Sequence, residues 1–335
     1  MTARIARPDG APEGCAPRLA VVLATPDRFE TIRQTVSHLA RQSARSEIEL
    51  ILVAPSVADL QGDEALLGRF ARVVRVEVGT VGSIGSANAA GIRRASAPVV
   101  ALAEDHAFPQ PDWAEQLIAA HEGPWVAVGP SVENANPRTA VSRADLYIGY
   151  SPWLAPGAPC DDVELLPGHN SSYKTAALLG YGADLDDMMN AETLLHWDLR
   201  RRGERLRFAP AARIVHANFS LWRSWLPAQF DYGRLFAGLR ARTMSPWRRV
   251  VYVAGSPLIP LVRLMRIRRD VARARAAGSW LDCLHALVAG LSMDALGQMA
   301  GYAFGPGDAE ARVSRFEYHR RRHVRADEVR ALWPV

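Results

Sequence analysis

The feature that most constrains the fold is an alternation of short apolar runs and helical patterns along the first 130 residues. Residues 19–24 and 49–53 are continuous apolar runs rich in β-branched side chains. Such runs are typical of strands buried on both faces of a parallel sheet. Between them, apolar residues recur at helical spacing through residues 29–42. Further strands are expected at residues 73–78, 98–103 and 125–129. Beyond residue 130, short strands are expected at 163–166, 206–208 and 213–216, with a polar loop at 167–174. The alternation predicts an α/β fold with a mostly parallel sheet and flanking helices.

Composition excludes several classes of protein. Of the 335 residues, 49% are hydrophobic and 22% are charged, which is ordinary for a globular chain. The net charge of +5 comes almost entirely from arginine, because Lys174 is the single lysine. Overall basicity is therefore weak evidence for a partner, and no nucleic acid is expected. Cys15, Cys160 and Cys283 are too far apart to indicate a zinc site or a disulfide framework, so a reducing, cytoplasmic setting is expected.

Three changes of character divide the chain. Residues 1–17 are polar and lack the apolar core of a signal peptide, so we expect a disordered tail. Residues 18–220 form the α/β domain, in which a regular half, 18–130, is followed by a loop-rich half, 131–220. Loop-rich segments are where an enzyme places a variable acceptor pocket. Residues 221–335 are expected to form an amphipathic helical region.

A cluster of polar residues follows the fourth predicted strand. Glu104, Asp105 and His106 come directly after the apolar run 98–103. Open α/β sheets bind ligands outside the carboxyl ends of their strands. Carboxylate and imidazole groups are also the side chains that hold divalent cations. The triplet therefore predicts a metal site; the alternative is that its charges only serve a turn or a helix start.

A stretch of small residues, 79–92, leads into the third predicted helix. It has neither the ending of a phosphate-binding loop nor a dinucleotide-binding fingerprint. Two interpretations stay open. The small residues either allow close contact between helix and sheet, or Gly85 and Asn88 bring hydrogen-bond donors beside a nucleotide.

The carboxyl-terminal third suggests contact with a membrane surface. Residues 222–275 contain twelve arginines against Asp231 and Asp270 only. The apolar segments 250–262 and 280–304 are interrupted by prolines or polar residues, and neither offers the roughly 20 uninterrupted apolar residues of a membrane span. Such helices suit the plane of an anionic membrane surface, whereas the alternative is a helical subdomain packed on the core.

Five landmarks between residues 18 and 220 resemble family 2 glycosyltransferases, which have the GT-A fold. They are the first strand with its Thr-Pro turn, the helix start at 85–92, the triplet 104–106, the loop 168–174 and the pair Ala191-Glu192. The resemblance implies a Rossmann-like, mixed and mostly parallel sheet with flanking helices, followed here by the C-terminal helical region.

The resemblance also assigns roles to residues. Glu192 would be the catalytic base. His106, Asp105 and His216 would hold Mn²⁺ or Mg²⁺, although a lone histidine beside a strand, as His216 is, more often has a structural role. The nucleotide-sugar donor would contact Thr25, Pro26, Arg28, Gly85, Asn88, Glu104 and Asp105. The acceptor or a phosphate would contact His169, Asn170 and Lys174.

Three departures from the family pattern accompany these roles. Ala54-Pro55-Ser56 stands where the family has a base-contacting Asp, so recognition of uracil is not implied. His106 stands in place of a metal-binding Asp, and imidazole favours manganese slightly over magnesium. Glu192 replaces the catalytic Asp, which lengthens the side chain by one methylene and keeps its proton chemistry.

We expect an inverting, metal-dependent glycosyltransferase at the cytoplasmic face of a bacterial inner membrane, peripheral or monotopic, acting on a glycan or lipid-linked acceptor. Two other functions stay open. A sugar-activating nucleotidyltransferase would carry a Gly-, Arg- and Lys-containing loop after the first strand, and Thr25-Pro26-Asp27 lacks one. A non-catalytic protein that binds sugar nucleotides at a membrane is the second.

Overall fold

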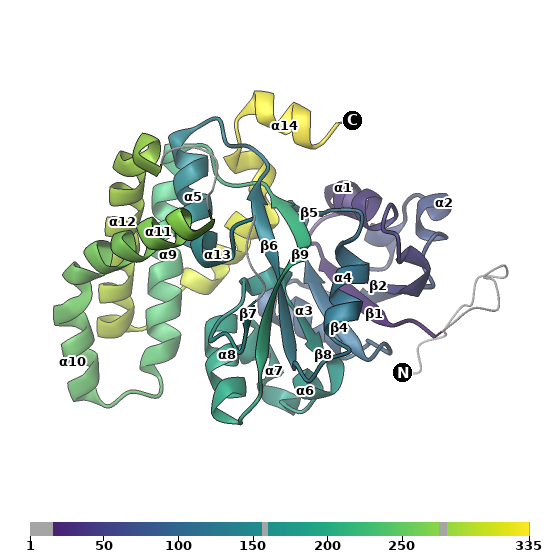
Figure 1. Cartoon of the computed structure of the whole chain (residues 1–335), viewed down its shortest axis with the longest axis horizontal. Helices are drawn as coiled ribbons and strands as arrows, with labels where there is room; N and C mark the ends of the chain where they lie inside the picture. Colours follow the sequence, from purple (N-terminus) through teal and green to yellow (C-terminus); the bar gives the residue numbers. More distant parts are fainter. Residues whose placement is uncertain (1–15, 156–159, 275–279, 335) are drawn as a thin grey trace.

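The protein is built around one mixed sheet with helices on both sides (Figure 1). A computed structural model describes residues 16–155, 160–274 and 280–334. In the described residues the strands follow the order β3-β2-β1-β4-β8-β6-β9-β5, and β7 pairs with β9. Their bounds are β1 Leu19–Ala24, β2 Ile48–Ala54, β3 Arg72–Glu77, β4 Val99–Ala103, β5 Ala107–Pro109, β6 Ala127–Asn134, β7 Cys160–Asp161, β8 Ser172–Lys174 and β9 Leu206–His216.

Successive side chains of a strand point to opposite faces of the sheet, and each face has its own apolar core. Leu19, Val21 and Leu23 of β1 pack with α1 (Phe29–Leu39) and α4 (Trp113–Ala120) on one face of the sheet. Ala20 and Val22 face the opposite core, because successive strand side chains point to opposite faces. That second core contains the helices α3 Ile84–Ile92, α6 Thr175–Leu179, α7 Leu185–Met189 and α8 Glu192–Arg201. The short α2, Glu64–Leu67, precedes β3.

The long ladders β1–β2, β1–β4, β2–β3 and β6–β9 are all parallel. The expected mixed, mostly parallel sheet with flanking helices is therefore confirmed, but three local expectations were wrong. Residues 163–166 are not a strand. The polar loop 168–174 ends in β8, which lies antiparallel between β4 and β6. The two closing strands are one strand, β9, interrupted by a register shift opposite Pro130 and Ser131 of β6.

The C-terminal half adds a helical layer beside β6 and β9 (Figure 1). It consists of α5 Ala140–Tyr150, α9 Trp222–Ala241, α10 Pro246–Gly255, α11 Ile259–Ala274 and α12 Leu284–Phe304. Val141 of α5, Val271 of α11 and Leu287 of α12 belong to the same apolar core as Leu19 of β1. The helical region therefore shares a core with the sheet, and the expected boundary near residue 220 is a change of secondary structure within this shared core.

The last described segment returns to the sheet. It comprises α13 Ala309–Tyr318, the 3₁₀ turn Arg320–His323 and α14 Ala326–Leu332. The indole Nε1 of Trp333 donates to the backbone oxygen of Asp105 at 3.3 Å. This return places C-terminal side chains beside the triplet. Of the expected N-terminal tail, residues 1–15 lie outside the described residues.

One helical stretch, Pro246–Ala274, is long and apolar enough by length and composition to cross a membrane. Only 11% of its most apolar part is buried inside the protein. The two prolines that interrupt the apolar sequence do not end the helical path. Pro257 lies in a 3₁₀ turn, and Pro260 lies in the first turn of α11, where a missing backbone N–H is tolerated.

Candidate functional site

Glu104, His106 and His216 converge at the carboxyl end of β4. The antiparallel pairing of β5 with β9 sets Ala107 opposite His216, which brings the end of β9 beside the triplet. Nε2 of His106 lies 3.8 Å from Oε1 of Glu104, and Nε2 of His216 lies 3.6 Å from Oε2 of the same carboxylate. One ligand atom from each of the three residues lies within 4.8 Å of the others. A possible metal site is therefore present at the predicted position.

Both histidines are oriented by a neighbouring oxygen acceptor. Nδ1 of His106 lies 2.7 Å from Oδ1 of Asp105, and Nδ1 of His216 lies 3.0 Å from Oδ1 of Asn218. Because a carboxylate or amide oxygen accepts, each Nδ1 carries the proton and each Nε2 is left as the ligating atom. This is the usual arrangement around a metal-bound histidine. The predicted ligand set thus changes: Glu104 faces the histidines, and Asp105 orients His106.

The electrostatics of the group fit a cation. Burial alone would raise the pKa of Glu104, but His106 and His216 lower it to about 2. Burial alone would lower the pKa of His106, but the Glu104 carboxylate raises it to about 9. Nε2 of His106 is buried, has no hydrogen bond of acceptable geometry and faces the carboxylates of Glu104 and Glu317. A cation among these groups, either a proton on Nε2 of His106 or a metal ion in its place, would balance the negative charge of the two carboxylates.

The proposed base is linked to this group by a short loop. Glu192 is buried at the first position of α8. Its Oε1 lies 2.5 Å from Nδ1 of His169 and accepts from the His169 backbone N–H at 3.2 Å. Burial alone would lower the pKa of His169, but Glu192 raises it to about 10. The next residue, Asn170, donates from Nδ2 to Oε2 of Glu104 at 2.7 Å. The loop 168–170 therefore holds Glu192 and Glu104 in one hydrogen-bonded unit.

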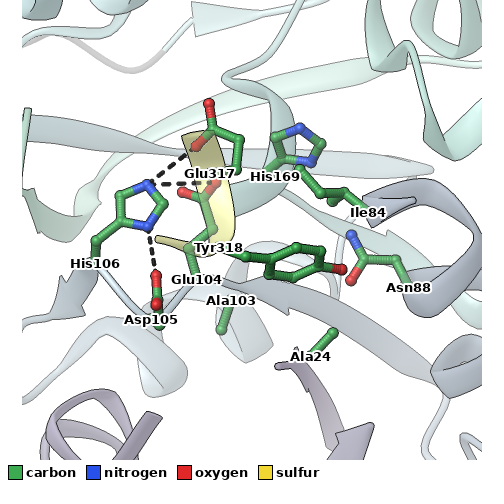
Figure 2. Close-up of a pocket in the computed structure, with 10 residues that line it drawn as sticks. All are labelled: Ala24, Ile84, Asn88, Ala103, Glu104, Asp105, His106, His169, Glu317 and Tyr318. Carbon is green, nitrogen blue, oxygen red and sulfur yellow. Dashed lines mark hydrogen bonds and ion pairs between the residues drawn. The ribbon is translucent and has the colours of Figure 1, made fainter. Parts of the chain in front are cut away.

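A pocket lined by Glu104, Asp105 and His106 lies at this end of the sheet (Figure 2). Its walls include Ala24 at the end of β1, Asn88 of α3 and His169. Asn88 is thus placed where the sequence predicts donor contacts. Thr25 is buried next to the wall, Pro26 is half-buried and Arg28 is exposed. The structure leaves these four residues as candidates for donor binding.

Two predicted site residues are engaged elsewhere. The Gly85 backbone N–H donates to Oδ1 of Asn190 at 3.0 Å, so it already has an acceptor within the protein. Lys174 pairs with Val99, the first residue of β4, whereas the triplet follows the last one. Its Nζ donates to the backbone oxygen of His121. The structure therefore does not bring Lys174 to the site, because the polar loop becomes a strand that runs away from it.

Sequence reasoning missed the C-terminal contribution to the pocket. Glu317 and Tyr318, the last two residues of α13, form one wall of the pocket. Figure 2 shows Tyr318 extending toward Asn88 and Glu317 facing His106. No local pattern around residue 317 signals this, because the site lies more than 200 residues earlier in the chain.

Carboxylate and histidine side chains at the carboxyl end of a central strand lie where open α/β sheets bind their ligands. Residues 20–150 match the family model described as Glycosyl transferase family 2. The pre-mycofactocin glycosyltransferase of Mycobacterium tuberculosis, from strains CDC 1551 and H37Rv, is 27% identical over 228 residues. That alignment covers 62% of this chain and 48% of the relative, so the chain spans about half the length of the curated relatives it matches. Over residues 20–150 the chain is thus similar to glycosyl transferase family 2.

Solved structures with a similar arrangement were also found. The mannosyltransferase PcManGT from Pyrobaculum calidifontis, in complex with GDP-Man and Mn²⁺, is 16% identical with a TM-score of 0.48, and the match covers 87% of this chain and 90% of that one. TarS residues 1–349 from S. aureus, in complex with UDP, is 12% identical with a TM-score of 0.46, and the match covers 84% of this chain and 90% of that one.

Proposed function

We propose that this protein is a metal-dependent, inverting glycosyltransferase that moves a sugar from a nucleotide-sugar donor to a hydroxyl group of an acceptor. The observation that carries the proposal is the convergence of Glu104, His106 and His216 beside a pocket, with Glu192 linked to them through the loop 168–170. The match of residues 20–150 to the Glycosyl transferase family 2 model supports the reaction class.

The residues divide the chemistry between leaving group and nucleophile. A Mn²⁺ or Mg²⁺ ion held by Glu104, His106 and His216 would neutralise the charge that develops on the departing nucleoside diphosphate. Glu192 would accept the proton of the acceptor hydroxyl. The imidazolium of His169, which contacts Glu192, supplies positive charge next to the pocket. The nucleophile would then attack the face of the sugar opposite the leaving group, which inverts the anomeric centre.

The test of the base assignment is Glu192→Gln, which keeps the side-chain size and removes its ability to accept a proton. We expect transfer to fall by about 10²- to 10⁴-fold, with nucleotide binding unchanged. Transfer is measured as release of nucleoside diphosphate, and binding by calorimetry. The matched control is Glu204→Gln, an exposed glutamate just beyond α8, which should keep wild-type activity. Full activity of Glu192→Gln would remove Glu192 from the mechanism.

We place the enzyme at the cytoplasmic face of a bacterial inner membrane, with a glycan or lipid-linked acceptor. The support is an exposed apolar stripe at helical spacing along α10 and α11, formed by Trp247, Val250, Val251, Leu258, Leu261, Val262 and Met265. Trp247 is 73% exposed and Leu258 is 63% exposed, so the stripe is not covered by the protein. Exposed arginines lie on the same two helices: Arg248, Arg266, Arg268, Arg269 and Arg273. An apolar face bordered by arginines suits an anionic lipid surface.

A further inference from the structure

Glu317 places a third carboxylate against the metal-binding group. It comes from α13, more than 200 residues after the triplet, and its Oε2 lies 3.3 Å from Nε2 of His106. We propose that Glu317 is a fourth protein ligand of the divalent cation held by Glu104, His106 and His216, so that the C-terminal segment completes the metal site. This inference rests on the cation site of the proposed function.

The distance from Glu317 to His106 matches that between two ligands that share an ion. Oxygen and nitrogen ligands lie about 2.0–2.2 Å from a small divalent cation, so neighbouring ligand atoms are about 3.0–3.6 Å apart. Glu317 and His106 fall inside this range at 3.3 Å. The contacts from Glu104 to His216 and to His106 are 3.6 and 3.8 Å. Glu317 therefore lies closer to the ligand atom of His106 than Glu104 does.

Neighbouring donors fix the carboxylate in this position. The hydroxyl of Tyr232 donates to Oε1 of Glu317, and the guanidinium of Arg320 donates to Oε2. Carboxylate ligands are commonly oriented by such hydrogen bonds. Glu317 is thus a buried and oriented carboxylate aimed at an imidazole nitrogen that has no hydrogen-bond partner among the described residues.

The helix that carries Glu317 is itself anchored. Arg312 of α13 makes two hydrogen bonds to Asp231 of α9, at 2.9 and 2.8 Å. Leu235 and Leu239 of α9 pack with Ala309 and Val313 of α13. Because α9 shares the main apolar core, α13 is held relative to the sheet. The position of Glu317 is therefore determined by tertiary packing as well as by its own contacts.

The experiment titrates the full-length protein with Mn²⁺ alone and measures free ion by electron paramagnetic resonance. We expect Glu317→Gln to weaken Mn²⁺ binding at least about tenfold, since even residues that only support ligands contribute that much. The matched control is Glu310→Gln on the same helix, whose side chain accepts from Asn190 at 3.0 Å; its affinity should equal that of wild type. Unchanged or tighter Mn²⁺ binding by Glu317→Gln would overturn the inference.

Two further variants separate the possible failures. His216→Ala tests the site itself: if it binds Mn²⁺ as well as wild type, the cation site of the proposed function is wrong. If His216→Ala weakens binding and Glu317→Gln does not, only the fourth ligand is wrong. Should Glu317→Gln lose its native circular dichroism spectrum, Glu317→Asp is used, because Arg320 then keeps a carboxylate partner. The shorter side chain should also weaken Mn²⁺ binding, and unchanged affinity would count against the ligand role.

Discussion

His121 is a buried residue that is kept neutral by its surroundings. It follows the last turn of α4, and its Nε2 lies 2.9 Å from the Ser172 hydroxyl. Burial, with a smaller effect of Lys174, lowers its pKa to about 3. The pKa in the unfolded chain is about 6.5. Between these values the unfolded state binds more protons than the folded state, so the contribution of His121 to stability is complete above pH 6.5 and is lost as the pH falls toward 3.

We therefore predict that His121→Gln makes the free energy of unfolding less dependent on pH. Between pH 6 and 4 the slope should decrease by up to about 1.4 kcal/mol per pH unit, the value for one proton. Urea denaturation at a series of pH values measures the slope of the free energy of unfolding against pH. The control is His285→Gln, in which an exposed imidazole is replaced, and its slope should match that of wild type. Equal slopes for His121→Gln and wild type would contradict the assignment.

The candidate metal site shows which roles of single residues could be predicted from the sequence and which could not. The triplet was predictable because polar residues at the end of a buried strand are unusual unless they bind something. The choice between Glu104 and Asp105 was not predictable, since it depends on how the chain turns after Ala103. His216 was identifiable only as a candidate, because its partner is set by the register of β5 with β9. No feature of the sequence around Glu317 predicted that this residue lies beside the candidate metal site.

At the scale of elements, α9 and α12 pack unusually closely through glycine. A Cβ atom on Gly297 of α12 would lie 2.0 Å from the backbone oxygen of Phe230 in α9. On Gly301 it would lie 2.4 Å from the backbone oxygen of Arg234. Backbone atoms cannot rotate away as a side chain does, so any larger residue must push the two helices apart.

We predict that Gly297→Ala destabilises the protein by about 1–3 kcal/mol or more, the usual cost of overpacking. The control is Gly149→Ala in α5, where a Cβ would meet nothing within 4 Å. Alanine should be neutral or should stabilise that helix by up to about 1 kcal/mol. Chemical denaturation of both variants measures the difference. A Gly297→Ala protein as stable as Gly149→Ala would show that the helices do not pack this closely in solution.

Elements with a strong local pattern were predictable, and those that depend on distant partners were not. β1 is a continuous apolar run and α1 has apolar residues at helical spacing, and both fall close to their expected positions at 19–24 and 29–42. β8 has three residues and exists because β4 and β6 flank it on both sides. The sequence predicts two short strands where the structure has one, β9. The residues between the two predicted strands lie opposite Pro130 and Ser131, where the pairing register shifts. In both cases tertiary pairing, and not propensity, decides the structure.

At the scale of the whole molecule, the C-terminal region connects a surface to the site. The helices α10 and α11 carry the exposed apolar stripe, whereas α13 ends at the pocket with Glu317 and Tyr318. Arg263 of α11 links the two sides of this region, donating to Asp294 of α12 and to the Ile148 backbone oxygen of α5, each at 2.8 Å. A membrane bound at the stripe would lie on the outer surface of the same helical layer that anchors α13. A lipid-linked acceptor would then reach the enzyme from that side.

The membrane proposal predicts that the protein floats with vesicles containing phosphatidylglycerol and binds phosphatidylcholine vesicles less, because the arginines require an anionic surface. The double variant Leu258→Glu, Leu261→Glu should lose binding at least about tenfold, since burying one leucine contributes about 1.5–3 kcal/mol. The control is Leu179→Glu, which changes an exposed leucine on α6 and should float like wild type. Peripheral binding also requires that carbonate at high pH releases the protein. Retention after that wash would favour a span at Pro246–Ala274, and equal flotation of the double variant would contradict membrane contact through this stripe.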